Sequence, residues 1–414
     1  MEYRINDIKE GLKGLRKQLS SAESDVEKLR IYTAMGNSYI LISDAEDTRD
    51  NILNAQLCFD EAGKIAERIG NSSELADIEE LTGFAFFKLS FIENRNENLK
   101  LSMEHYLNAL SLLGHENLEK YISVRYNLAN VYLALRDGNE REYILKAIDI
   151  LKEILEISKT LGRNQSTVTI SNTLGTAYLL LSEITSNSLK GSYLESAMEF
   201  FNEALQHIEF EESPLDFASA HNGMGVSLMK IGDINTEKDK YYRDAITHLD
   251  MALKVYTPEA SPSDFASTEY TLGICYFKIA LIDPEHSKEL LNKAENSLRQ
   301  SLEIFDRDSS PKEFLKVECY LSQVLRELYL ITKDKKYLDE CVERFKSTLT
   351  IVTEEKDPLT YATINFLLGE SLYFQGKLKD SLPYYLEAER VTNSFDPSLA
   401  KKISDVRKNI QAIQ

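Results

Sequence analysis

The sequence predicts an all-α solenoid built from eight antiparallel helix pairs, and three observations lead to this prediction. The segment SPLDFASAHNGMG at 213–225 returns 48 residues later, at 261–273, as SPSDFASTEYTLG. A small residue recurs at a nearly constant interval along the chain, and a pattern of small and bulky residues follows it each time. A period of roughly 20–50 residues is typical of arrays in which each unit packs against its neighbours.

In the second half of the chain, the first helix of each pair is predicted to begin at a proline. Pro214, Pro262, Pro311 and Pro358 lie 48, 49 and 47 residues apart, and an aromatic residue follows each proline three positions later. Proline fits the first turn of a helix because its missing N–H would have no intrahelical partner there. We call the four helices that start here, and their equivalents in the first half, A helices.

Each predicted A helix carries one small residue in its interior. The eight positions recur at intervals of 46 to 50 residues, and they are Gly36, Gly83, Ala129, Gly175, Gly225, Gly273, Ser322 and Gly369. A glycine inside a helix costs about 1 kcal/mol relative to alanine. Its recurrence therefore predicts that a neighbouring helix approaches closely at this point.

The second helix of each pair, the B helix, carries a small residue, a bulky residue four positions later and another small residue three positions after that. Ala197, Phe201 and Ala204 are one example, and the third repeat is looser, with Ile154 at the last position. Spacings of four and three residues place all three side chains on one helical face. The pattern predicts that the bulky side chain fills the gap between two closely packed helices.

Helix pairs with this order of residues resemble the tetratricopeptide repeat. TLGTAYLLL at 173–181 and AMEFFNEA at 197–204 match the pattern of that family best, and the resemblance covers about residues 23–392. It implies a right-handed superhelical solenoid of eight helix pairs. The repeats here average nearly 48 residues, whereas the usual unit has about 34. HEAT or armadillo repeats, which have similar periods, are the alternative fold.

The two ends of the chain are predicted to form capping helices, over residues 1–22 and 393–414, on either side of the repeats at 23–392. Apolar residues lie at helical spacing in both segments, for example at Leu12 and Leu15 and at Ile403 and Val406. A solenoid needs end helices with one polar face to remain soluble.

Composition and charge exclude several classes of function. The chain has 414 residues, 43% of them hydrophobic, and a net charge of −19. This charge argues against nonspecific binding of nucleic acid and against docking on an anionic membrane, since both need a basic surface. The beginning of the chain does not resemble a signal peptide, and no segment approaches 18 consecutive apolar residues. We therefore expect a cytoplasmic protein.

No pattern of catalytic or metal-binding residues stands out. The six histidines fall singly, and the four cysteines are widely spaced, without a CxxC pair. The G-x-G at Gly223 and Gly225 lies inside a predicted helix and follows no strand, so it does not match a phosphate-binding loop. We expect a protein that is not an enzyme and that binds no metal or cofactor.

The resemblance also implies where a ligand would bind. In tetratricopeptide repeats, the A helices line the concave groove. The residues that face the groove lie three positions before and one position after the small residue. In this sequence, Cys319 is one of the residues at these positions. The candidate ligand-binding residues in this sequence are Asn37, Phe84, Tyr126, Asn130, Asn172, Thr176, Asn222, Tyr270, Gln323 and Phe366. These positions lack the Lys and Arg with which chaperone-binding members hold a terminal carboxylate.

The predicted function is a non-enzymatic scaffold or adaptor that binds a protein or peptide segment in the concave groove. One alternative is a regulatory, peptide-sensing member of the same superfamily. Another is the detached interaction module of a repeat-plus-protease system. The candidate groove residues are mostly amides and aromatic side chains, which suits hydrogen bonding to a peptide backbone and aromatic anchoring.

Overall fold

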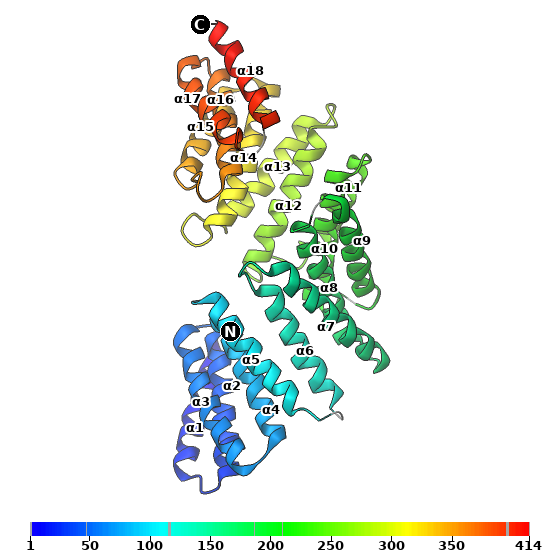
Figure 1. The fold of residues 1–414 in the computed structure, drawn as a ribbon, viewed down its shortest axis with the longest axis vertical. Coiled ribbons are helices and arrows are strands. Elements are labelled where there is room, and N and C mark those ends of the chain that lie inside the picture. The colour runs from blue at the N-terminus through cyan, green and yellow to red at the C-terminus, as the bar shows by residue number, and fades with distance from the viewer. Residues whose placement is uncertain are drawn as a thin grey trace. The chain divides into compact units, whose positions relative to one another are not determined.

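A computed structural model describes residues 2–46, 48–114, 117–185, 187–208, 210–394 and 397–413 of the chain. These residues form eighteen α-helices (Figure 1) and, within the same ranges, no β-strand. The chain divides into two compact units, Met1–Ile208 and Glu209–Gln414. Within each unit, helices that are adjacent in the chain pack against each other. The prediction of an all-α solenoid of consecutive helix pairs is confirmed.

The first unit contains α1 and the first four helix pairs. Its helices are α1 (Glu2–Ser21), α2 (Asp25–Ser43), α3 (Thr48–Ile69), α4 (Ser72–Leu89), α5 (Arg95–Leu112), α6 (Leu118–Ala134), α7 (Glu140–Thr160), α8 (Asn164–Glu183) and α9 (Asn187–Gln206). The A helices are α2, α4, α6 and α8, and each is followed by its B helix.

The second unit contains the other four helix pairs and α18. Its helices are α10 (Pro214–Ile234), α11 (Lys238–Ala252), α12 (Pro262–Ala280), α13 (Ser287–Leu302), α14 (Pro311–Thr332), α15 (Lys335–Leu349), α16 (Pro358–Phe374), α17 (Leu378–Thr392) and α18 (Pro397–Ile413). The A helices α10, α12, α14 and α16 begin at the four predicted prolines.

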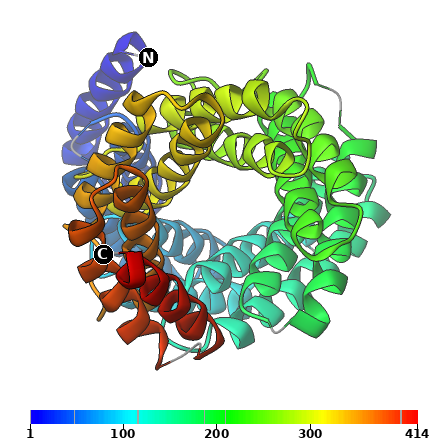
Figure 2. The ribbon, with the colours of Figure 1, turned by 90° about the horizontal axis from the view of Figure 1, so that it is seen from above.

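Within each unit, the A helices of successive repeats also touch one another. Such contacts join α2 to α4 and α4 to α6 in the first unit, and α10 to α12, α12 to α14 and α14 to α16 in the second. Figure 2 shows the helices of the second unit, coloured from green to red, following one another in chain order. The A helices therefore form a shared layer on which neighbouring repeats can build one binding surface.

The predicted close approach at the small residue of the A helix is confirmed. A β-carbon at Gly175 would lie 2.6 Å from Phe201 Cε1, and one at Gly273 would lie 2.8 Å from Leu298 Cγ. Phe201 and Leu298 are the bulky residues of the B-helix pattern, and both are buried. The two patterns in the sequence thus describe the two sides of one contact, between the A and B helices of the same repeat.

The turns from a B helix to the next A helix differ between the two units. In the first unit, Gly70 and Gly162 end α3 and α7 with φ near +66° and +65°, a left-handed conformation that glycine adopts readily. In the second unit, the residue before each A helix is Ser213, Ser261, Ser310 or Asp357, and proline follows directly. Only the second kind of turn leaves a proline signal in the sequence.

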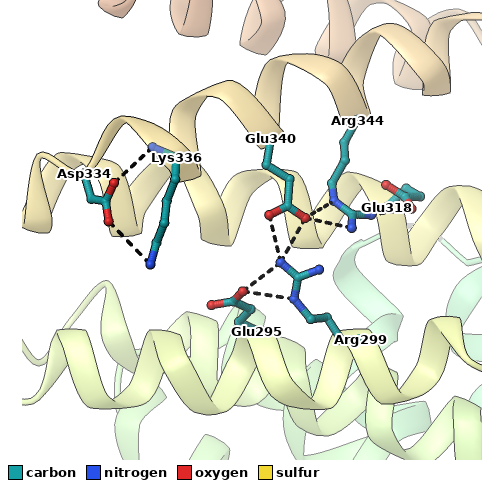
Figure 3. Close-up of polar contacts among 7 residues, drawn as sticks. All are labelled: Glu295, Arg299, Glu318, Asp334, Lys336, Glu340 and Arg344. Carbon is teal, nitrogen blue, oxygen red and sulfur yellow. Dashed lines mark hydrogen bonds and ion pairs between the residues drawn. The ribbon is translucent and has the colours of Figure 1, made fainter.

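A network of ion pairs joins the sixth and seventh repeats, in the second unit. Arg299 on α13 binds Glu340 on α15 at 2.9 Å, and Arg344 on α15 binds both Glu340 and Glu318 on α14 (Figure 3). Glu318 is only 6% exposed, so its carboxylate depends on Arg344 for its charge partner. Removing one partner of this buried ion pair is therefore expected to lower the stability of the fold strongly, unlike removing one partner of an isolated surface pair.

Candidate functional site

All ten candidate residues lie on A helices, as the repeat pattern predicts. In the first unit, Asn37 lies on α2, Phe84 on α4, Tyr126 and Asn130 on α6, and Asn172 and Thr176 on α8. In the second unit, Asn222 lies on α10, Tyr270 on α12, Gln323 on α14 and Phe366 on α16. Because the candidates fall into two separate units, each group is considered within its own unit.

The candidates of the first unit differ in how far a ligand could reach them. Asn37, Phe84 and Thr176 are exposed, and Tyr126 is half-buried. Asn172 is only 5% exposed. The hydroxyl of Thr176 donates a 3.0 Å hydrogen bond to the backbone carbonyl of Asn172. The accessible candidates of the first unit are therefore separate side chains on different helices, both polar and aromatic.

Side chains of neighbouring A helices already bond to one another in the first unit. The Tyr126 hydroxyl lies 3.0 Å from the Thr173 hydroxyl, joining α6 to α8. Ser123 donates a 2.7 Å hydrogen bond to Glu80, joining α6 to α4, and Lys120 forms an ion pair with the same carboxylate. These bonds hold successive repeats together, and a ligand would have to replace them to use the same groups.

Two candidates of the second unit are also occupied by contacts within the fold. The Asn222 side-chain oxygen accepts a 3.1 Å hydrogen bond from the Thr268 hydroxyl of α12. The ring of Phe366 packs edge-to-face on Tyr385 of α17, with 5.8 Å between ring centroids. Both side chains therefore contribute to packing between helices.

Tyr270 and Gln323, the remaining two candidates, line one cavity. Its volume is about 690 Å³, and we call it the α14–α16 cavity. Its walls come from α12, α14, α15, α16 and the turn at 350–357 between α15 and α16. The lining residues are Tyr270, Pro311, Lys312, Leu315, Lys316, Cys319, Tyr320, Gln323, Phe345, Ile351, Val352, Lys356, Asp357, Leu359, Thr360, Thr363, Ile364 and Leu367. Binding pockets for small ligands typically have about 300–1,000 Å³.

The inner wall of the α14–α16 cavity is apolar and aromatic. The rings of Tyr270 and Tyr320 meet edge-to-face with 5.8 Å between centroids. Gln323 donates a 3.1 Å hydrogen bond to the backbone carbonyl of Cys319, one turn earlier on α14. This bond turns the amide back onto its own helix.

The one thiol in the lining is not activated for chemistry. Burial raises the pKa of the Cys319 thiol to about 12, so it stays protonated at neutral pH. The thiolate is the reactive form of cysteine. The cysteine of the α14–α16 cavity is therefore a poor nucleophile.

Three lysines lie at the rim of the α14–α16 cavity. Lys312 and Lys316 lie about one turn apart on α14, and Lys356 lies in the turn before α16. All three side chains are exposed, and none forms an ion pair with a carboxylate among the described residues. Asp357, the acidic residue of the lining, caps α16 by accepting a 3.0 Å hydrogen bond from the Thr360 amide.

The sequence pattern identified Tyr270, Gln323 and Cys319 but missed the three lysines. Lys312 and Lys316 precede the small residue Ser322 by ten and six positions, outside the two positions that the resemblance implied. Lys356 lies before the helix begins. The available signal was their shared nearness to the starts of two successive A helices, at Pro311 and Pro358.

Two of the three histidines of the second unit form a pair rather than a metal site. His221 Nδ1 lies 2.9 Å from His248 Nδ1. Burial, together with the neighbouring His248, lowers the pKa of His221 to about 4. In the part of the chain that the structure describes, no three His, Cys, Asp or Glu side chains are grouped as a metal ion would need.

Comparisons with known proteins identify relatives in fold only. No protein-family model matches the chain, and no curated protein matches it. One similar solved structure is a signal transduction ATPase with a tetratricopeptide repeat sensor from Pyrococcus horikoshii. It is 18% identical with a TM-score of 0.51, and the alignment covers 93% of this chain and 55% of that one. This chain therefore spans about half the length of that protein.

Two other similar structures are matched over nearly their full length. The apo form of the quorum sensor NprR from B. thuringiensis is 14% identical with a TM-score of 0.48, and the match covers 94% of this chain and 98% of that one. The apo form of RapI is 18% identical with a TM-score of 0.42 and coverages of 96% and 98%. The likeness to the Pyrococcus structure shows a fold of the tetratricopeptide type.

Every helix in the described part of the chain is too short or too polar to span a bilayer.

Proposed function

We propose that this chain is a peptide-sensing regulatory module that binds a short peptide in the α14–α16 cavity. The observation that carries the proposal is the cavity itself, about 690 Å³ in volume and lined by two candidate groove residues, Tyr270 and Gln323. A cavity of this size suits a few residues of a peptide better than a long segment laid across many repeats. This favours the sensing function over the scaffold function.

The position of the cavity gives a physical route from binding to a response. Its walls include two successive A helices, α14 and α16, and the turn that connects α15 to α16. A ligand that contacts both helices would stabilise the arrangement of repeats in which those contacts are best. The similar Pyrococcus protein carries a tetratricopeptide repeat sensor, and sensing by the same kind of fold supports the proposal.

The proposed function needs no catalytic step by this chain. The cavity lining contains no histidine, and its cysteine is held as a protonated thiol by burial. Specificity would come from the apolar wall and from a few polar groups at the rim, which is the usual division in binding pockets.

The test compares two tryptophan substitutions at the same position of the repeat. Thr363 on α16 and Ser267 on α12 both precede the small residue by six positions, and both are exposed. Only Thr363 lines the cavity. We expect Thr363→Trp to obstruct the cavity and Ser267→Trp to leave it open, with little effect of either on stability, because exposed positions tolerate substitution.

The measurement is retention of random N-acetylated pentapeptides by the immobilised chain, quantified by mass spectrometry. The proposal expects the parent and Ser267→Trp to enrich the same peptides and Thr363→Trp to lose most of that enrichment. Equal enrichment by all three proteins would place the peptide elsewhere, and no enrichment by the parent would contradict peptide sensing.

The adaptor function remains the second candidate because the second unit carries exposed apolar side chains where A helices end. Ile234, Leu281 and Ile331 are 48%, 52% and 45% exposed. Exposed apolar residues that gather on one edge are typical of protein-binding surfaces. Replacing these three residues with serine would weaken binding of a protein partner while leaving retention of pentapeptides unchanged.

A further inference from the structure

We propose that the ligand of the α14–α16 cavity carries a carboxylate, which Lys312, Lys316 and Lys356 hold at the rim while apolar residues of the peptide occupy the interior. This inference rests on the proposed function and specifies the chemistry of the peptide. These lysines lie at other positions than the groove residues that the repeat pattern identified, so the site is separate from a clamp built on those residues.

The charges around the cavity favour an anionic ligand. The chain as a whole has a net charge of −19. Four other lysines in the described part of the second unit pair with carboxylates, as Lys293 does with Glu289 at 2.8 Å. The three rim lysines make no ion pair within the described residues. Three cations beside an apolar cavity in an acidic protein complement a carboxylate that the ligand would supply.

The beginning of α14 adds a second source of positive potential at the same place. Pro311 and Lys312, the first residues of α14, line the cavity. The N-cap residue Ser310 makes no capping hydrogen bond with its side chain, whereas Asp357 caps α16. The first amides of a helix carry a partial positive charge and attract anions when no side chain covers them. A ligand carboxylate beside Lys312 would be attracted by the partial positive charge at this end of α14.

The apolar part of the ligand is indicated by the side chains next to the lysines. Leu315 lies between Lys312 and Lys316 in the chain and lines the cavity, as do Ile364 and Leu367 of α16. Leu359 is 57% exposed at the start of α16 and also lines the cavity. A ligand with an apolar side chain next to its carboxylate would cover these groups and pair with the cations together.

The test uses three pools of N-acetylated pentapeptides and the same retention assay. The first pool has a free C-terminal carboxylate and no Asp or Glu, the second is its C-terminal amide, and the third is an amide pool that includes Asp and Glu. Retention of the first pool over the second identifies a terminal carboxylate. Retention of the third over the second identifies an acidic side chain.

The variants remove one rim charge and one matched charge elsewhere. Lys316→Gln removes a cation from the cavity, and Lys288→Gln removes an exposed cation from α13, outside the lining. We expect Lys316→Gln to reduce retention of the preferred pool by about tenfold, since a hydrogen bond between charged groups contributes about that much. Lys288→Gln is expected to leave retention unchanged.

The outcomes separate this inference from the proposed function. Retention of a carboxylate-bearing pool that falls in Lys316→Gln alone supports the inference. Retention of the neutral amide pool as strong as that of the other two overturns it while leaving peptide binding in place. A loss of the same size in both lysine variants also overturns it, because the effect would then be one of overall charge. If no pool is retained by the parent, both proposals fail.

Discussion

The two units of the chain are built on the same repeat but differ in what their A helices present. Neighbouring A helices are bonded to each other in both units, as Ser123 is to Glu80 in the first and Thr268 is to Asn222 in the second. In the first unit, the described cavities do not include a candidate groove residue. In the second unit, Tyr270 and Gln323 line a cavity of about 690 Å³ with three lysines at its rim. The contacts that build the repeat are the same in both units, but the side chains available to a ligand differ between them.

This difference shows that the residues that determine the fold are not the residues that determine which ligand can bind. The small residue of the A helix and the bulky residue of the B helix meet in both units, as Gly175 meets Phe201 and Gly273 meets Leu298. The polar pair beside this contact changes from repeat to repeat. It is Glu79 with His105 in the first unit and His221 with His248 in the second.

The largest expected effect concerns the buried ion pair, a feature of the second unit. Arg344→Met leaves the Glu318 carboxylate, 6% exposed, without its charge partner at 2.7 Å. We expect the free energy of unfolding to fall by about 3–5 kcal/mol, measured by urea denaturation followed by circular dichroism. Lys64→Met, which removes an exposed pair in the first unit, should have little effect.

A second variant distinguishes a lost charge partner from lost packing at this site. Adding Glu318→Leu to Arg344→Met removes the unpaired carboxylate and should recover most of the stability. If the double variant is as unstable as Arg344→Met alone, the loss is not due to the buried charge.

The next largest effect concerns the contact that both units share. Gly273→Leu places a branched side chain where even a β-carbon would lie 2.8 Å from Leu298 Cγ. Overpacking of this kind typically costs about 1–3 kcal/mol, seen as a lower urea midpoint. Gly14→Ala in α1 is the control, because a β-carbon at Gly14 has no neighbour within 4 Å. It should be neutral or stabilising, since alanine favours helix. Equal midpoints for Gly273→Leu and the parent would contradict the close approach.

A smaller effect concerns the polar pairs that contain histidine, which are Glu79 with His105 in the first unit and His221 with His248 in the second. Burial and His248 lower the pKa of His221 to about 4, below the usual value near 6.5, so the folded chain favours the neutral imidazole. The resulting stability is present above about pH 6.5 and is lost as the pH falls toward 4. His221→Glu would recreate the carboxylate–imidazole pair of the first unit and should reduce this loss.

The measurement for the histidine pair is the urea midpoint at pH 7 and at pH 5. The parent should lose more stability on acidification than His221→Glu does. His207→Asn, which removes an exposed histidine of the first unit, serves as the control and should behave as the parent does. The same loss of stability in the parent and in His221→Glu would show that the pair is not responsible.

Much of the fold could be predicted from the sequence because its determinants are local and repeated. Pro214, Pro262, Pro311 and Pro358 each begin a helix, and a small residue facing a bulky one is a contact within a single repeat. The division into two units was not predicted, although all eight prolines of the chain lie in the second unit, because the small residue of the A helix recurs at nearly the same interval across the boundary.

The candidate site could be predicted only in part. The repeat pattern selected Tyr270 and Gln323, which line the cavity, but it gave equal weight to Asn222 and Phe366, whose side chains pack between helices. Whether a side chain faces a cavity or a neighbour depends on the residues of the adjacent repeat. A pattern defined within one repeat does not contain this information.

The central claim is that the second unit, at the α14–α16 cavity, binds the ligand. Hydrogen-exchange mass spectrometry of the full chain, with and without the pentapeptide most enriched in the retention assay, tests it most directly. The account predicts slower exchange at the start of α14, in the turn at 350–357 and at the start of α16, with α6 and α8 unchanged. Protection of α6 and α8 with no change around 350–357 would contradict it and would place the ligand on the first unit.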